Sequence, residues 1–465
     1  MTTFEHTGFW WDASEPGTKW PGTLRFDPVS GAELRRVIPA DPRLFFADAK
    51  EFELLHGETT GGLRVTLLSA FERDHSEIYA NAVILGFHAE SADPPITVAA
   101  AVIEQLDEWW HPRALTHDPA LNHPDVSVQY RQPADVELHD DGVIRTTLRS
   151  AGLPSYGPRE VSIREEIRIE MKASAPQPLS VFRARMHACQ DLLSVAALTL
   201  CDVEELRLVP PYEDKRKAVI GRFYAVPIYK DPASRGADFL FRSPDVETRL
   251  PSMFGAWLES AERLSVVRSL FFSGAYGKTF LELRLLAFAQ AAEGYHRRAY
   301  EGQDLYMDAG VYERDVLPQL RSAIPKSIGS DHRQALKKRM EFGNEVSFGR
   351  RLRTLVKDHE VALAAAVPDP CSWVQTIIDY RNGFTHHPVA DEAVPERDKI
   401  ELIQCNYVLQ VLLELCFLKS MALEEETIAA LAKKCDRYRK IRERFFSDDA
   451  AKESGAKAQG ASGGD

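Results

Sequence analysis

Hydrophobic and polar residues follow different patterns in the two halves of the chain. In the first half, short runs rich in Val, Ile, Thr and aromatic residues are separated by Pro and Gly, and in residues 161–171 apolar residues recur mostly at every second position. Such alternation is typical of half-buried β-strands. The predicted strands are 22–27, 33–38, 62–71, 77–85, 126–130, 143–148, 161–171 and 222–229, with helices at 103–110 and 179–200.

From residue 251 onward the apolar spacing is that of amphipathic helices. The predicted helices are 253–264, 280–300, 311–322, 333–342, 348–366, 373–384, 399–421 and 427–446. The preceding stretch is polar and contains Pro and Gly, as domain junctions often do. The sequence therefore predicts an α+β protein with a β-rich domain at 1–235, a linker at 236–250, a helical bundle at 251–446 and a Gly/Ala/Ser-rich disordered tail at 447–465.

Composition excludes several classes of protein. Of the 465 residues, 44% are hydrophobic and 27% charged, the balance of a folded globular chain. No window of about 18 uncharged apolar residues is present, and the first residues lack the basic-then-apolar order of a signal peptide, so we expect a cytoplasmic protein without a membrane partner. The six cysteines include no C-x-x-C pair, and neither a metal site nor another cofactor is expected.

The strongest local signal for chemistry is the run Asp379-Tyr-Arg-Asn-Gly-Phe-Thr-His-His-Pro388 at the end of a predicted helix. Arg381 and His386 would stand about 140° apart on a regular helix, but Gly383 and Pro388 predict a break that lets both face one cleft. The guanidinium of arginine can donate two hydrogen bonds to phosphate oxygens, and histidine titrates near neutral pH, so the pair suits a phosphate site. The alternative is a helix end where basic side chains cap carbonyls. Two adjacent histidines diverge in direction, which disfavours a metal site.

These residues resemble the signature of the HEPN ribonucleases, in which an arginine and a polar residue precede a histidine four to six positions after the arginine. The segments Leu281-Glu-Leu283 and Gln290-Ala-Ala-Glu293 are similar to the first long helix of that all-helical family. The first half resembles the N-terminal domain of ApeA-type anti-phage proteins. The resemblance lies in the short motifs Gly8-Phe-Trp-Trp11, Pro21-Gly-Thr-Leu24 and Gln105-Leu-Asp-Glu-Trp-Trp110.

The resemblance implies an endoribonuclease of anti-phage defence that needs no metal and uses the 2′-hydroxyl of the RNA as nucleophile. His386 would be the general acid or base, Arg381 would hold the scissile phosphate, and Asn382 would orient the histidine or donate a hydrogen bond. Glu293 would fix Arg381 or the histidine tautomer, and His387 is the second candidate base. Relatives of this family join two motifs across a two-fold axis, which predicts a homodimer through the helical domain.

Basic residues are concentrated near the end of the predicted bundle, with aromatic residues between them. The candidate RNA-binding residues are Lys433, Lys434, Arg437, Arg439 and Lys440, and smaller groups lie at 333–339 and 350–353. Such groups attract RNA phosphates, although a solvated helix face gives the same pattern. Transfer RNA is one candidate substrate, and a phage-derived trigger is the expected partner of the first domain.

Two other functions fit the same sequence. The HEPN bundle could be a non-catalytic binding or dimerisation module beside a ligand-sensing β domain. It could also be the toxin of a toxin–antitoxin pair, which shares the chemistry and differs in its partner.

Overall fold

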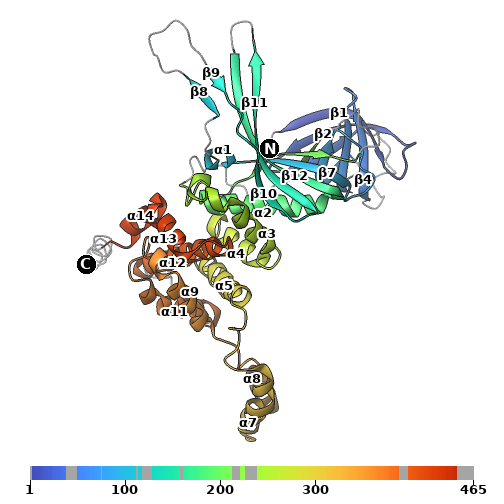
Figure 1. The fold of residues 1–465 in the computed structure, drawn as a ribbon. Helices are drawn as coiled ribbons and strands as arrows, with labels where there is room; N and C mark the ends of the chain where they lie inside the picture. The colour runs from blue at the N-terminus through green and yellow to red at the C-terminus, as the bar shows by residue number, and fades with distance from the viewer. Residues whose placement is uncertain are drawn as a thin grey trace, which may run out of the picture. The chain divides into compact units, whose positions relative to one another are not determined.

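The computed structural model of the chain describes residues 3–37, 50–74, 76–110, 114–117, 128–157, 161–211, 220–225, 238–386 and 396–447. Contacts between residues divide the chain into two compact units, Met1–Leu258 and Glu259–Asp465. The first unit is rich in β-strands and the second is helical, as the ribbon shows (Figure 1), so the predicted α+β class is confirmed.

Six strands of the first unit close into a barrel. Strand β6 pairs with both β3 and β5, which completes the circuit β6-β3-β2-β1-β4-β5 with antiparallel neighbours throughout. A closed circuit leaves no sheet edge open along its strands. The strands are β1 Phe4–Asp12, β2 Trp20–Asp27, β3 Gly31–Arg36, β4 Glu51–Thr59, β5 Arg64–Glu72 and β6 Glu77–Leu85.

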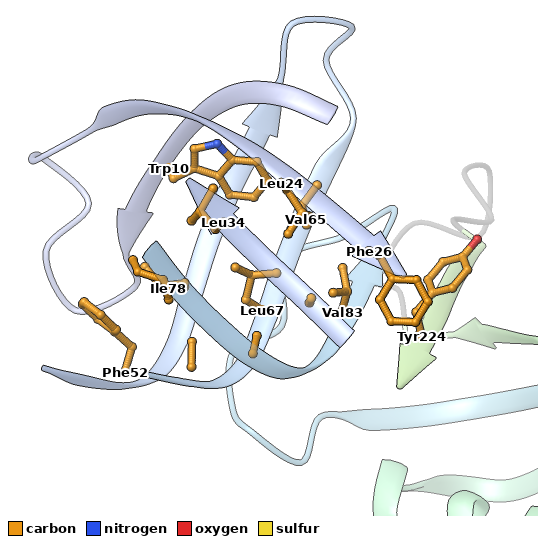
Figure 2. Packing of buried hydrophobic residues seen from close by; sticks show 14 of the residues in the cluster. Trp10, Leu24, Phe26, Leu34, Phe52, Val65, Leu67, Ile78, Val83 and Tyr224 are labelled. Carbon is orange, nitrogen blue, oxygen red and sulfur yellow. The ribbon is translucent and has the colours of Figure 1, made fainter. Parts of the chain in front are cut away.

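The barrel is filled by the inward-facing side chains of its own strands, together with Tyr224 from a later strand (Figure 2). Trp10 is fully buried among them, and its indole nitrogen donates to the carbonyl of Gly22 at 3.0 Å. A Cβ at Gly57 would lie 2.2 Å from Cε3 of Trp10, so only glycine leaves room for the indole. The Trp10 side chain is therefore a packing residue and not part of a binding surface.

The same sheet continues beyond the barrel, so that twelve strands of the described chain form one sheet. The remaining strands run in the order β14-β13-β7-β12-β11-β10, and helix α2 contacts β7 and β12. Their bounds are β7 Pro95–Ile103, β10 Val136–Asp140, β11 Ile144–Tyr156, β12 Val161–Pro178, β13 Val203–Val209 and β14 Gly221–Ala225. A separate hairpin pairs β8 Leu115–His117 with β9 Val128–Tyr130, and the helices are α1 Leu106–Trp109 and α2 Leu179–Ala197.

The predicted linker at 236–250 is not a solvent-exposed connection over its described part. Leu240 and Phe241 are buried, and the backbone N–H of Leu240 donates to the carbonyl of Ala196 at 2.8 Å. The next helix, α3 Leu250–Glu259, joins the same unit because the Trp257 indole donates to the carbonyl of Ala188 on α2 at 2.6 Å. The β-rich unit thus extends to Leu258, later than the predicted start of the bundle at residue 251.

The second unit packs its helices around α12, which contacts α4, α5, α9, α10, α11, α13 and α14. Helix α12 is long and apolar enough over Lys399–Ser420 to cross a membrane, but 72% of that window is buried inside the protein. The helix bounds are α4 Ser265–Tyr276, α5 Leu281–Ala299, α6 Ala309–Val311, α7 Leu317–Ser322, α8 Ser330–Glu341, α9 Phe348–Asp358, α10 Glu360–Leu363, α11 Trp373–His386, α12 Glu396–Ser420, α13 Glu425–Lys434 and α14 Asp436–Phe445.

The helical periodicity predicts most of these elements but not their breaks. The predicted helix at 348–366 is divided into α9 and α10 at His359, and the one at 427–446 into α13 and α14 at Cys435, whose backbone is extended. Helix α4 is missing from the sequence prediction. The predicted tail lies outside the described residues beyond position 447.

A buried carboxylate joins the last helix to the centre of the bundle. Glu414 on α12 is fully buried, and it accepts a hydrogen bond from the hydroxyl of Tyr438 at 2.9 Å and from the Gln410 amide at 3.1 Å. Arg437 on α14 supplies the compensating charge, with its guanidinium 3.2 Å from the carboxylate. Removing one partner of such a pair leaves an uncompensated charge in the core.

We therefore expect Arg437→Met to lower the free energy of unfolding by about 3–5 kcal/mol. Arg439→Met is the matched control, because Arg439 pairs with the exposed Asp436 and such exposed pairs contribute about 0–1 kcal/mol. Chemical denaturation of the two variants measures the difference. Equal losses in both would contradict the buried-pair account.

Candidate active site

Helix α11 directs Arg381 toward the interior of the bundle. Val374 and Ile377 form the buried side of this helix, and Arg381 follows Val374 by seven residues, about 20° away on a regular helix. The Arg381 side chain is therefore only 28% exposed. A charge on that side of a helix requires a partner of opposite charge.

The partner of Arg381 is Glu293 on α5, which the sequence proposed for this role. The Arg381 guanidinium lies 3.8 Å from the Glu293 carboxylate and 3.2 Å from the side-chain oxygen of Asn382, to which it donates a hydrogen bond. The guanidinium also lies over the ring of Phe348 at 5.4 Å, a cation–π distance. Three sides of the arginine are thus held by residues from α5, α9 and α11.

The charges continue beyond Glu293 in alternating sign. The other carboxylate oxygen of Glu293 accepts from Arg297 at 3.0 Å, and Arg297 also donates to Glu345 at 2.7 Å. Glu345 lies just before α9, in a segment that bridges back to Leu305. Arg381 is the end of this series, with its guanidinium still partly open to solvent.

A second arginine, on α9, is buried against His296, which follows Glu293 by about one turn of α5. Arg351 on α9 has no exposed surface, and it donates to Asp304 at 2.7 Å, to Nδ1 of His296 at 3.1 Å and to the carbonyl of Val346 at 3.0 Å. His296 itself is 1% exposed. Arg351 belongs to one of the predicted basic groups, but this burial assigns it to the framework that holds α5, α9 and the connecting segment together.

The predicted break at Gly383 is absent, because α11 continues to His386 as a regular helix. A glycine inside a helix costs only about 1 kcal/mol, which neighbouring contacts can offset. The hydroxyl of Thr385 also donates to the carbonyl of Arg381 at 2.9 Å. Position 386 therefore follows Asn382 by one helical turn and lies about 140° around the helix axis from Arg381. His387 lies outside the described residues.

The basic residues of the last two helices are not part of this cluster. Phe446, just after α14, packs against Trp373 at the start of α11, about 12 Å along the helix from Arg381. Lys433, Lys434, Arg439 and Lys440 are exposed. Arg437 is not, since its pairing with Glu414 directs it inward, and its prediction as an RNA-binding residue is corrected.

Several residues of the cluster were outside the sequence prediction. Arg297 carries a readable signal, because it follows Glu293 by four residues on the same helix. Phe348 and Glu345 have no such signal, since only the packing of α9 against α5 and α11 brings them to the site. Among the described residues, no group of three or more His, Cys, Asp or Glu side chains could hold a metal ion.

The buried histidine next to the cluster makes stability depend on pH. Burial and the neighbouring Arg351 guanidinium hold the pKa of His296 below its ordinary value of 6.5. As pH falls through 6.5, the unfolded chain therefore binds the proton before the folded chain does, and the stability present at higher pH is lost.

We expect His296→Gln to reduce this loss between pH 7 and pH 5 by up to about 1.4 kcal/mol per pH unit. The glutamine oxygen can still accept from Arg351 but does not titrate. Urea denaturation at several pH values measures the slope, with His332→Gln, at an exposed position on α8, as the control. Identical slopes for His296→Gln and wild type would refute the assignment.

Two known families match most of the described chain, one in each half. The model of the ApeA N-terminal domain 1 matches residues 5–257, more than half of the chain, and ends next to the unit boundary at Leu258. The model of the Apea-like HEPN domain matches residues 286–427, which include Glu293, Arg381 and His386. Neither a curated protein nor a solved structure gives a match. The chain therefore belongs to the ApeA family and combines an ApeA N-terminal domain with an Apea-like HEPN domain.

Proposed function

We propose that this HEPN protein is a metal-independent endoribonuclease of anti-phage defence. The observation that carries the proposal is the placement of Arg381, which Glu293, Asn382 and Phe348 hold at the end of α11 with part of its guanidinium open. An arginine fixed in this way can bind a phosphate with little further loss of side-chain freedom. The β-rich domain would act as the sensor of a phage-derived trigger.

The proposed reaction is a transesterification within the RNA. The 2′-oxygen attacks the adjacent phosphorus, the bond from phosphorus to the 5′-oxygen breaks, and the products carry a 2′,3′-cyclic phosphate and a 5′-hydroxyl. Arg381 would neutralise the charge that develops on the phosphoryl oxygens. One proton leaves the 2′-hydroxyl and another must reach the leaving 5′-oxygen, so a general base and a general acid are both needed.

His386 is the first candidate for these proton transfers and His387 is the second. Positions 381 and 386 lie about 140° apart around the axis of α11, which favours a site that is completed by another chain. In a two-fold dimer the motif of one protomer meets its copy, which supplies a second histidine and a second arginine to the same phosphate. We therefore place both motifs near the axis of a homodimer.

Cleavage of RNA by purified variants tests the chemistry. We expect His386→Ala to lower the rate by about 10²–10⁴-fold through loss of acid–base catalysis, and Arg381→Ala by about 10²–10³-fold through loss of phosphate stabilisation. His387→Ala should have a smaller effect. The substrates are transfer RNA and total RNA, with excess EDTA, and a substrate methylated at the 2′-oxygen should resist cleavage.

Arg314→Ala is the matched control, because Arg314 is exposed and pairs with its exposed neighbour Asp315. Full RNA cleavage by His386→Ala, or loss of wild-type cleavage when EDTA is added, would contradict the mechanism. An inactive wild-type protein that still binds RNA through Arg381 would instead favour a non-catalytic binding module.

The dimer has its own test on the surface of the helical unit. Phe280 and Leu283, at the start of the helix that carries Glu293, are 78% and 55% exposed and offer apolar surface that a second protomer could cover. In analytical ultracentrifugation we expect wild type to sediment as a dimer and Leu283→Glu to sediment mainly as a monomer. The rate of RNA cleavage should fall in parallel. Val361→Glu, at an 80% exposed position on α10, should leave the dimer intact. A wild-type protein that cleaves RNA as a monomer would contradict this arrangement.

A further inference from the structure

Three consecutive apolar side chains are exposed on the segment that follows α5. Leu305, Tyr306 and Met307 are 40%, 48% and 41% exposed, although burial of their apolar surface would be favourable in free energy. The segment lies between α5 and α9, at the base of the part of the chain that carries α7 and α8 (Figure 1).

This exposure is not the result of a loosely held segment. Asn344 is only 5% exposed. Its backbone carbonyl accepts a hydrogen bond from the backbone N–H of Tyr306 at 2.9 Å, and its side-chain oxygen accepts one from the backbone N–H of Met307 at 3.0 Å. Its amide also donates to the carbonyl of Met307 at 2.9 Å. Asp304, one residue earlier, is bound to the buried Arg351. The apolar side chains are therefore presented from a fixed backbone.

The exposed ring of Tyr306 has a cation beside it. The guanidinium of Arg350 lies 5.2 Å from the ring centroid, and Arg350 is itself exposed. An aromatic ring next to an arginine is a combination that binds single-stranded nucleic acid, because a base stacks on the ring while the cation attracts the phosphate. Exposed basic residues on α8, including Lys337 and Lys338, add positive charge to the part of the chain between α5 and α9.

The ring is also connected directly to the residues around Arg381. The backbone N–H of Ser347 donates to the Tyr306 hydroxyl at 3.5 Å, and the next residue, Phe348, carries the guanidinium of Arg381 on its ring. Consecutive Cα atoms are about 3.8 Å apart, so Tyr306 and Arg381 contact neighbouring positions at the start of α9. One short RNA strand can therefore reach both side chains.

We propose that Tyr306, supported by Arg350, stacks an unpaired base of the RNA whose phosphate Arg381 binds. This inference rests on the proposed function and adds to it a base-stacking position, the ring of Tyr306 beside Arg350. Base stacking does not require the 2′-hydroxyl. A DNA strand should therefore occupy the same surface without being cut.

Fluorescence anisotropy with a labelled single-stranded 12-nucleotide DNA tests the stacking apart from the chemistry. We expect Tyr306→Ala to weaken binding about 5- to 150-fold, the range for loss of one base–aromatic stack. Tyr306→Phe keeps the ring and should bind within about twofold of wild type. Tyr156→Ala removes another exposed tyrosine, in the β-rich unit, and should have no effect. The blunt duplex of the same sequence should bind more weakly, since its bases are already stacked.

Unchanged binding by Tyr306→Ala, or equal losses in Tyr306→Ala and Tyr306→Phe, would overturn the proposal. So would a change in the sedimentation mass of Tyr306→Ala, which would make the surface a contact between protein chains. Failure of the proposed function has a different signature: wild type would not cut RNA at all, whatever the effect of Tyr306 on DNA binding.

Discussion

The arrangement of the site follows from one constraint, which is that an arginine on the buried side of a helix must find a negative partner. Arg381 continues the apolar side of α11, so its charge is compensated from within the bundle, by Glu293 on α5. Glu293 in turn accepts from Arg297, which reaches Glu345 before α9. Three helices are thereby held in register at the point where the arginine meets solvent.

The same constraint recurs where charge is buried more deeply. Arg351 and Glu414 have no exposed surface, and each is compensated by a partner from a different part of the chain, Asp304 and Arg437. Truncating one member of such a pair is strongly destabilising, whereas a half-exposed pair contributes little. Loss of one partner from a deeper pair would therefore leave an uncompensated charge in the core, whereas Arg381 keeps part of its guanidinium available for a ligand.

The sequence predicts the class of fold and the family motif because both are local. Alternation in the first half and helical spacing in the second half are read directly, and Arg381 with Asn382 is a contiguous signature. Partners from distant segments could not be predicted, as Arg437 shows: its exposure depends on Glu414 on another helix. The continuous helix through Gly383 was missed for a related reason, since tertiary contacts outweigh the weak preference of one glycine.

The chemical identity of the cut ends tests the central claim most directly. RNA incubated with the wild-type protein in excess EDTA can be analysed by mass spectrometry of the fragments, beside the same incubation with His386→Ala. The account predicts 2′,3′-cyclic phosphate on one fragment and 5′-hydroxyl on the other, both missing with the variant. Fragments with 5′-phosphate and 3′-hydroxyl ends would show attack by water at the phosphorus and would contradict the account.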